Sequence, residues 1–135
     1  FNMRFKSKLV VEVPLHDNGK RKLIEPLIHE LVIVPRGFET DYASIPRAFW
    51  VILAPTGKHT YAAVVHDYLY ASGLKTKEEA DKIFYDIMLA DLDVDRWQAW
   101  TMYQAVKYFG YQAWNEHKLR RENEILSNFN NGIGV

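Results

Sequence analysis

The chain has 135 residues, of which 48% are hydrophobic and 14% aromatic, which is the length of a single domain with one good core. Its 17 basic residues balance its 17 acidic ones, so no overall charge favours nucleic acid as a partner. Without any cysteine, the sequence excludes disulfide scaffolds, thiolate metal sites and cysteine nucleophiles. No apolar run approaches the roughly 20 residues that span a bilayer. Because the chain begins at Phe1 rather than at methionine, we expect that residues once preceded it, and whether these included a leader stays open.

The N-terminal third predicts strands. Residues 5–13 alternate apolar and polar side chains, as a half-buried strand does. The turn sequence Asp17-Asn18-Gly19 then predicts a hairpin, with residues 20–25 as the returning strand. Residues 27–34 are rich in Leu, Ile and Val and predict a third strand. Together these segments predict a small antiparallel β-meander.

The middle of the chain predicts three helices. Pro46 suits a first helical turn, so we expect a short helix over residues 47–53. A second helix opens at His59 or Thr60 and stops at the C-cap glycine of Ser72-Gly73. Thr76 and Glu79 have the spacing of a capping box, which predicts a third helix reaching about residue 90.

The C-terminal part predicts one long helix and a tail. Asp93 or Asp95 caps a helix that runs to Phe109 and on toward Trp114, with apolar residues almost all round it. Residues 115–135 form a charged, helix-compatible tail whose few apolar residues suit docking on a partner. We therefore expect an α+β fold in which the meander of about three strands packs on a bundle of three to four helices. Residues 1–114 would be the single domain and residues 115–135 the tail.

Ionisable residues in two segments predict a buried polar cluster. His66-Asp67 lies inside the apolar helical run of residues 62–70, and a polar turn with Asp41, Ser44 and Arg47 precedes it. Helical periodicity also turns Asp81 of the next helix partly toward the core. Buried carboxylates and imidazoles need partners, and the nearest donors are Arg47, Ser44 and Thr40 with the backbone of its turn.

Three interpretations of this cluster stay open. In the structural one, Arg47 pairs with Asp67 or Asp81, and His66 is a core histidine with its hydrogen bonds satisfied. In the second, a divalent metal is held by His66 with one or two of Asp41, Asp67 and Asp81. Adjacent His66 and Asp67 point about 100° apart on a helix, so the two do not easily ligate one ion together. In the third, His66 activates Ser44 as a nucleophile while an aspartate orients the imidazole.

The same residues carry a resemblance to a known family. The motifs V-P-x-G-F-x-T-D-x-A-S-I-P-R from Val34, A-A-x-x-H-D-x-L-Y from Ala62, E-A-D from Glu79 and M-Y-x-A-V-x-x-F-G from Met102 stand in this order. Together they resemble the DUF1353 family, a domain of unknown function found chiefly in tailed bacteriophages and prophages. The resemblance runs from about residue 23 to residue 114 and does not reach the tail.

This resemblance implies a context more than a reaction. It implies a phage protein located in the virion, and in the host cytoplasm during assembly, as a tail, hub or baseplate component. Its partners would be other phage structural proteins or further copies of itself, with no nucleic acid and no membrane span. The alternative is a small hydrolase, metal-dependent or of the Ser/His/Asp type, acting on the host envelope, for example on peptidoglycan. An intracellular protein that binds a host factor is a third possibility. The family supplies no reaction, so the candidate catalytic residues are the matched positions Asp41, Ser44, Arg47, His66, Asp67 and Asp81, and the candidate metal ligands are His66, Asp81 and Asp41.

Overall fold

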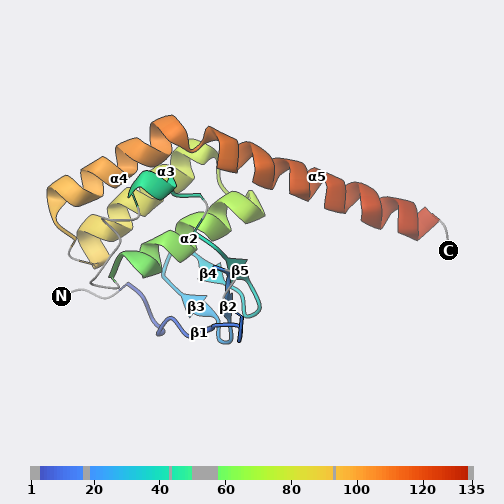
Figure 1. Cartoon of the computed structure of the whole chain (residues 1–135), viewed down its shortest axis with the longest axis horizontal. Coiled ribbons are helices and arrows are strands. Elements are labelled where there is room, and N and C mark those ends of the chain that lie inside the picture. The colour runs from blue at the N-terminus through green and yellow to red at the C-terminus, as the bar shows by residue number, and fades with distance from the viewer. Residues whose placement is uncertain (1–3, 17–18, 43, 50–57, 93, 134–135) are drawn as a thin grey trace.

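The fold was analysed in a computed structural model of the chain, which describes residues 4–16, 19–42, 44–49, 58–92 and 94–133. Five two- or three-residue strands precede the helices, so the α+β class expected from the sequence is confirmed (Figure 1). Strands β1 (Val11–Glu12), β2 (Arg21–Leu23) and β5 (Glu39–Thr40) form one antiparallel sheet in the order β1-β2-β5. Strands β3 (Leu27–Ile28) and β4 (Ile33–Val34) form a second antiparallel pair.

The strands differ from the expected meander in several respects. The strand expected over residues 5–13 is reduced to Val11–Glu12, with an isolated bridge from Phe5 to His29. Residues 27–34 do not form a single strand, because the chain turns back between Ile28 and Ile33 and makes a hairpin. The apolar content of this stretch comes from two short strands whose inner residues, Leu27 and Val34, are paired and fully buried. The central sheet is completed instead by β5, in which Glu39 pairs with Lys22 of β2. The hairpin turn expected at Asp17-Asn18 lies outside the described residues, although β1 and β2 do pair antiparallel.

Helix α2 (Lys58–Ser72) lies between the sheets and the other helices, which the close contacts of α2 with β4, β5, α3 and α5 also show (Figure 1). A single turn of 3₁₀ helix, η1 (Arg47–Phe49), precedes it, and the rest of the short helix expected over residues 47–53 lies outside the described residues. Gly73 ends α2 with a φ of 66° and a hydrogen bond from its N–H to the Leu69 carbonyl oxygen, so the expected glycine cap is confirmed.

Helix α3 (Lys77–Asp86) begins with the expected capping box: the Thr76 hydroxyl accepts from the Glu79 N–H, and the Glu79 carboxylate accepts from the Thr76 N–H. The helix widens into a π-helical turn, η2 (Ile87–Asp91). Helices α4 (Arg96–Phe109) and α5 (Tyr111–Ile133) follow and meet at Gly110, so the long helix expected to continue toward Trp114 is interrupted there. Helix α5 runs on past residue 115 and projects from the body of the molecule (Figure 1).

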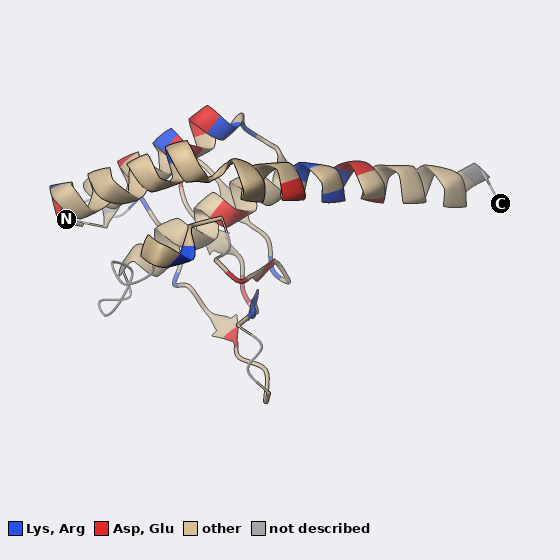
Figure 2. Cartoon of the chain, turned by 45° about the horizontal axis from the view of Figure 1, so that its top comes forward, with Lys and Arg blue, Asp and Glu red and all other residues tan. Residues whose placement is uncertain are grey.

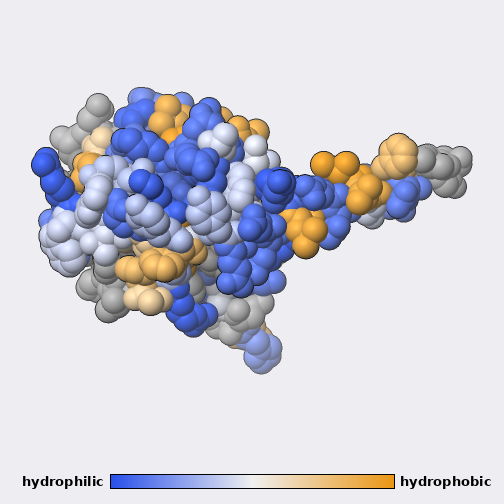
Figure 3. Space-filling view, turned by 90° about the horizontal axis from the view of Figure 1, so that it is seen from above, coloured by the Kyte–Doolittle hydropathy of each residue, from blue (hydrophilic) through white to orange (hydrophobic). Residues whose placement is uncertain are grey.

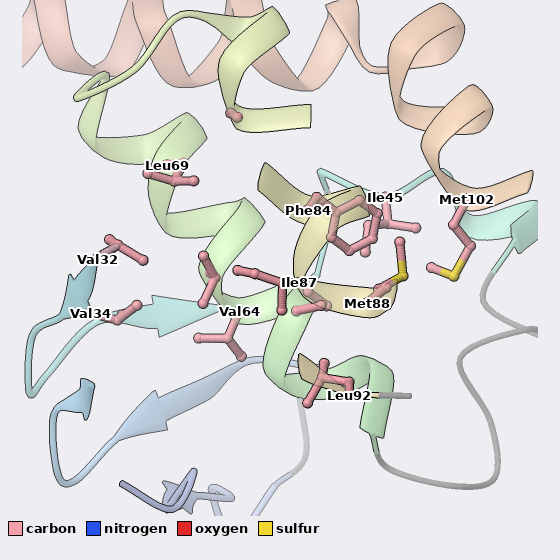
Figure 4. Packing of buried hydrophobic residues seen from close by; sticks show 14 of the residues in the cluster. Val32, Val34, Ile45, Val64, Leu69, Phe84, Ile87, Met88, Leu92 and Met102 are labelled. Carbon is pink, nitrogen blue, oxygen red and sulfur yellow. The ribbon is translucent and has the colours of Figure 1, made fainter. Parts of the chain in front are cut away.

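The core lies where α2, α3 and η2 meet. Its largest apolar members include Phe84, Ile87, Met88 and Met102. In Figure 4, Ile87 lies beside Val64 of α2, with Phe84, Met88 and Met102 on one side and Leu69 of α2 on the other. Within the described residues, no helix is long and apolar enough to cross a membrane.

Candidate functional site

Ser44, His66 and Asp81 form a continuous hydrogen-bonded chain through the core. His66 of α2 has its Nδ1 atom 3.0 Å from Ser44 Oγ and its Nε2 atom 2.7 Å from Asp81 Oδ1. All three residues are buried, with 0%, 0% and 2% of their surfaces exposed. Residues from the loop after β5, from α2 and from α3 thus meet at one point.

The Asp81 carboxylate assigns one hydrogen on the His66 imidazole. An ionised carboxylate can only accept, so His66 Nε2 carries a hydrogen that it donates to Asp81. In the neutral imidazole Nδ1 is then the acceptor, and the Ser44 hydroxyl donates to it. This is the order of groups in which an imidazole can take a proton from a serine while a carboxylate holds the ring.

Three donors converge on the Asp81 carboxylate. Besides His66, the Tyr70 hydroxyl donates to Oδ1 at 2.7 Å and the Lys77 ammonium donates to Oδ2 at 2.8 Å. Burial alone would raise the pKa of Asp81, but the hydrogen bonds from His66, Lys77 and Tyr70 outweigh it and hold the pKa below its ordinary value. Burial, with the neighbouring Asp81 carboxylate, raises the pKa of the Tyr70 hydroxyl, which therefore stays protonated.

Local structure explains why these groups meet. His66 and Tyr70 are four residues apart on α2, and Lys77 and Asp81 are four residues apart on α3, so each pair shares one face of its helix. The Lys77 ammonium also donates to the Val106 carbonyl oxygen at 2.8 Å and lies 4.3 Å from the centre of the Tyr111 ring. It thereby links α3 to both α4 and α5.

Asp67 is not part of the hydrogen-bonded chain of Ser44, His66 and Asp81. Its Oδ2 atom accepts the Thr40 hydroxyl proton at 2.7 Å, and its Oδ1 atom lies 3.4 Å from Nε2 of His117 on α5. The Thr40 Oγ1 atom in turn accepts from the Tyr42 N–H at 3.2 Å. Tyr42 has a φ of 60°, a left-handed conformation that is uncommon for a residue other than glycine, at the turn leading to Ser44. The divergence of His66 and Asp67 expected from helical geometry is therefore confirmed.

The remaining expected members of the cluster lie elsewhere. Asp41 and Arg47 are exposed, and the cation beside Asp81 is Lys77, so the expectation that Arg47 is a buried partner was wrong. Arg47 immediately opens η1, whose three residues are not buried. Asp41 lines a cavity of about 430 Å³ together with Lys20, Glu39, Thr40, Asp67, His117 and Arg120.

Sequence reasoning missed three contributors, Tyr70, Lys77 and His117. The first two could have been found, because Tyr70 lies four residues after His66 and Lys77 lies four residues before Asp81 on a helix whose start was predictable. Nothing in the local sequence places His117 beside α2, since that contact depends on how α5 returns across the body.

The geometry bears on the metal interpretation as well. Both nitrogens of His66 are engaged by Ser44 and Asp81, which leaves neither nitrogen directed at an ion. Among the residues that the structure describes, no three His, Cys, Asp or Glu side chains form a group able to hold a metal.

Comparison with known proteins identifies the family of the chain, but the family description and the relative name no reaction. The chain is 38% identical over 79 residues to the "Uncharacterized protein y4jT" of Sinorhizobium fredii (strain NBRC 101917 / NGR234). The similar segment covers 57% of this chain but 23% of the relative, so the chain spans about a quarter of the length of that protein. No solved structure matches the chain significantly. The pattern of the family described as "Protein of unknown function (DUF1353)" matches residues 22–106, from β2 through α4, and the chain belongs to this DUF1353 family.

Proposed function

We propose that the protein is a bacteriophage virion-associated component, in the tail, hub or baseplate, that acts by binding other proteins of the particle. The phage setting rests on the resemblance of the motifs. The contact itself is supported by one observation, an apolar stripe on the projecting part of α5. Its members are the exposed side chains Leu119, Ile125, Leu126 and Phe129.

The stripe is a coherent surface. At about 100° per residue, its four side chains fall within an arc of about 120° around the helix. The charged residues of α5 end at Glu124, so the terminal part carries none (Figure 2). Figure 3 shows hydrophobic residues in orange along this projecting part. An uncharged helix end with an apolar arc has the character of a docking surface.

The stripe does not face the body of the molecule. Two of the residues that hold α5 to α2 are His117 and Arg121: His117 lies beside Asp67, and the Arg121 guanidinium donates to the Tyr70 carbonyl oxygen. On a helical projection the centre of the stripe lies about 120° round from this side. A simple bend of α5 toward the body would therefore leave the stripe uncovered.

The projecting part also has little reason to be helical by itself. Residues 122–132 are all exposed and correspond to about 17 Å of helix. Isolated helices shorter than about 12–15 residues are marginal in water, and most helical stability in proteins comes from packing an amphipathic face. A partner that covers the stripe would supply that packing.

The proposal is tested by composition and by contact. Mass spectrometry of purified virions should detect the polypeptide, and cross-linking should join residues of α5 to another virion protein. If purified particles lack the polypeptide while infected cells contain it, the proposal fails.

A second candidate function is favoured by the Ser44–His66–Asp81 chain, namely a Ser/His/Asp hydrolase acting on the host envelope, for example on peptidoglycan. Ser44 borders a cavity of about 310 Å³, whose other lining residues are Pro46, Phe109, Gln112, Ala113 and Glu116. In this reaction the Ser44 oxygen would attack a carbonyl carbon while His66 Nδ1 takes the hydroxyl proton; the bond from that carbon to the substrate's amine or alcohol would then break, and His66 would give the proton to this leaving group. Water would then cleave the acyl ester and restore the serine.

A fluorophosphonate probe, which labels activated serines, tests this candidate. Labelling is expected on Ser44 and should be lost in Ser44→Ala, while Ser127→Ala, which changes an exposed serine on α5, should label normally. If the folded wild-type protein does not label, and His66→Ala leaves phage infection and lysis unchanged, the hydrolase is ruled out.

A further inference from the structure

Two charged residues lie within the arc of the apolar stripe on α5. At about 100° per residue, the directions of Lys118 and Glu122 fall between the two edges of the stripe. Both side chains are exposed. The other acidic and basic residues of α5 point outside that arc. A partner that covers the stripe must therefore also pair one cation and one anion, because taking an unpaired charge out of water is costly.

The stripe side of α5 is open from the first turn of the helix onward. Tyr111 precedes Phe129 by about five whole turns, so the two rings leave the helix in the same direction. Tyr111 is 54% exposed, Phe129 is 62% exposed, and Leu119 between them is exposed as well. A partner helix can thus lie along the whole of α5, including the part whose other side packs on α2.

We infer that the stripe is covered by α5 of a second copy of this chain, which runs in the opposite direction. This pairing rests on the proposed function, because it names one protein of the particle that occupies the stripe. In an antiparallel pair centred at residue 120, Lys118 of each copy lies level with Glu122 of the other. The same register sets Phe129 level with Tyr111 of the second copy. The surface therefore complements itself under a two-fold axis.

Charge decides the direction of the pair. In a parallel pair identical residues lie level, so Lys118 would face Lys118 of the second copy and Glu122 would face Glu122. Charged residues along the seam of paired helices select the orientation that brings opposite charges together. The antiparallel pair meets this condition twice, once for each copy.

The pairing also supplies the packing that the projecting part of α5 lacks. Residues 122–129 of one copy would lie along residues 111–118 of the other, which belong to the part of α5 held by the body. Each exposed helix end would then rest on a supported helix, and burial of its apolar arc would stabilise it. The two family domains would lie toward opposite ends of the helix pair.

Sedimentation of the whole chain with charge-reversed variants tests the pairing. The wild type should dimerise at micromolar concentration. Lys118→Glu and Glu122→Lys should each raise the dissociation constant of the dimer about tenfold, because each replaces two attractive contacts with two repulsive ones. The double variant Lys118→Glu/Glu122→Lys restores both contacts and should dimerise as the wild type does. The matched control is Glu124→Lys, which reverses an exposed charge outside the arc and should leave the dissociation constant unchanged.

The direction of the pair is measured separately. The chain has no cysteine, so a nitroxide spin label on Asn130→Cys, an exposed position beside the stripe, marks one site per copy. In the antiparallel pair the two labels are roughly 30 Å apart along the axis, whereas a parallel pair places them level.

Three results would overturn the inferred pairing: a wild type that stays monomeric, charge-reversed single variants that dimerise as the wild type does, or labels that lie level. The chain could still be a virion component bound to another protein in each of these cases. Conversely, purified particles without the polypeptide would refute the proposed function and leave a measured dimer intact.

Discussion

At the scale of the residue, Asp81 is the centre of the buried polar network, because its one carboxylate accepts hydrogen bonds from His66, Tyr70 and Lys77. Asp81→Ala would leave the Lys77 ammonium buried without its counter-charge. We expect a loss of about 3–5 kcal/mol in the free energy of unfolding, measured in urea. The control is Asp86→Ala on the same helix, where an exposed carboxylate pairs with Lys82, and a loss under about 0.5 kcal/mol is expected. Equal losses in the two variants would show that Asp81 is not the centre of the network.

The same carboxylate predicts an acid dependence. The folded-state pKa of Asp81 lies below its ordinary value, so its contribution is fully present above the unfolded-state pKa of about 4. That contribution is lost as the pH falls through the lower folded-state pKa. The difference in unfolding free energy between the wild type and Asp81→Asn should therefore shrink below about pH 4. A difference that grows on acidification would mean that the pKa is raised in the folded protein.

Some residues of the candidate site could be predicted from the sequence, and others could not. Helical periodicity identified His66 and Asp81 as buried and separated His66 from Asp67, because those facts depend on local geometry. Arg47 was wrongly expected inside, since a charge next to a polar turn has no periodicity to orient it. The contact of His117 with Asp67 joins residues 50 positions apart, and such contacts depend on packing that no local pattern encodes.

At the scale of the element, Gly110 separates α4 from α5. A Cβ atom there would lie 2.3 Å from the Val106 carbonyl oxygen and 2.7 Å from the Tyr70 hydroxyl. Gly110→Ala should therefore cost about 1–3 kcal/mol of stability and disturb the Tyr70 hydroxyl that donates to Asp81. Gly132→Ala is the control, because a Cβ at that helical position meets nothing within 4 Å.

The free energy of unfolding of both glycine variants is measured in urea. Gly132→Ala should be neutral or slightly stabilising, since alanine favours a helix more than glycine does. If Gly110→Ala were as stable as the wild type, the close approach of α4 to Tyr70 would be wrong.

The helix ends that are marked by capping residues were the most predictable element boundaries. The Thr76–Glu79 capping box and the Gly73 cap both occur where the sequence indicates them. The expectation of one strand over residues 27–34 was wrong because their apolar content outweighed the polar pair His29-Glu30, which interrupts the run where the hairpin turns. The interruption at Gly110 was missed because one glycine is tolerated inside a helical pattern, and only the nearby Val106 carbonyl oxygen and Tyr70 hydroxyl show why glycine is needed.

At the scale of the whole molecule, α5 extends beyond the family domain of residues 22–106 and has an exposed apolar stripe. The sequence predicted apolar residues after position 115 that suit a partner, but not their alignment on one side of a helix that begins at Tyr111. That alignment depends on α5 continuing without a break from its packed part to its exposed part. The direction of the stripe then follows from the residues that hold α5 to α2.

The stripe supports a prediction about association that leaves folding untouched. Leu126→Glu places a charge in the apolar arc, whereas Ser127→Glu places the same charge about 100° away on the polar side. Both side chains are exposed, so both variants should unfold within about 0.5 kcal/mol of the wild type. Leu126→Glu should nevertheless lose incorporation into virions, measured by mass spectrometry of purified particles, while Ser127→Glu is incorporated normally. Sedimentation of the isolated chain distinguishes the two kinds of partner. If the wild type self-associates and Leu126→Glu alone does not, the partner on the stripe is a second copy of the chain. If the wild type stays monomeric, the partner is another virion protein. Equal incorporation of the two variants would show that the stripe is not the contact surface.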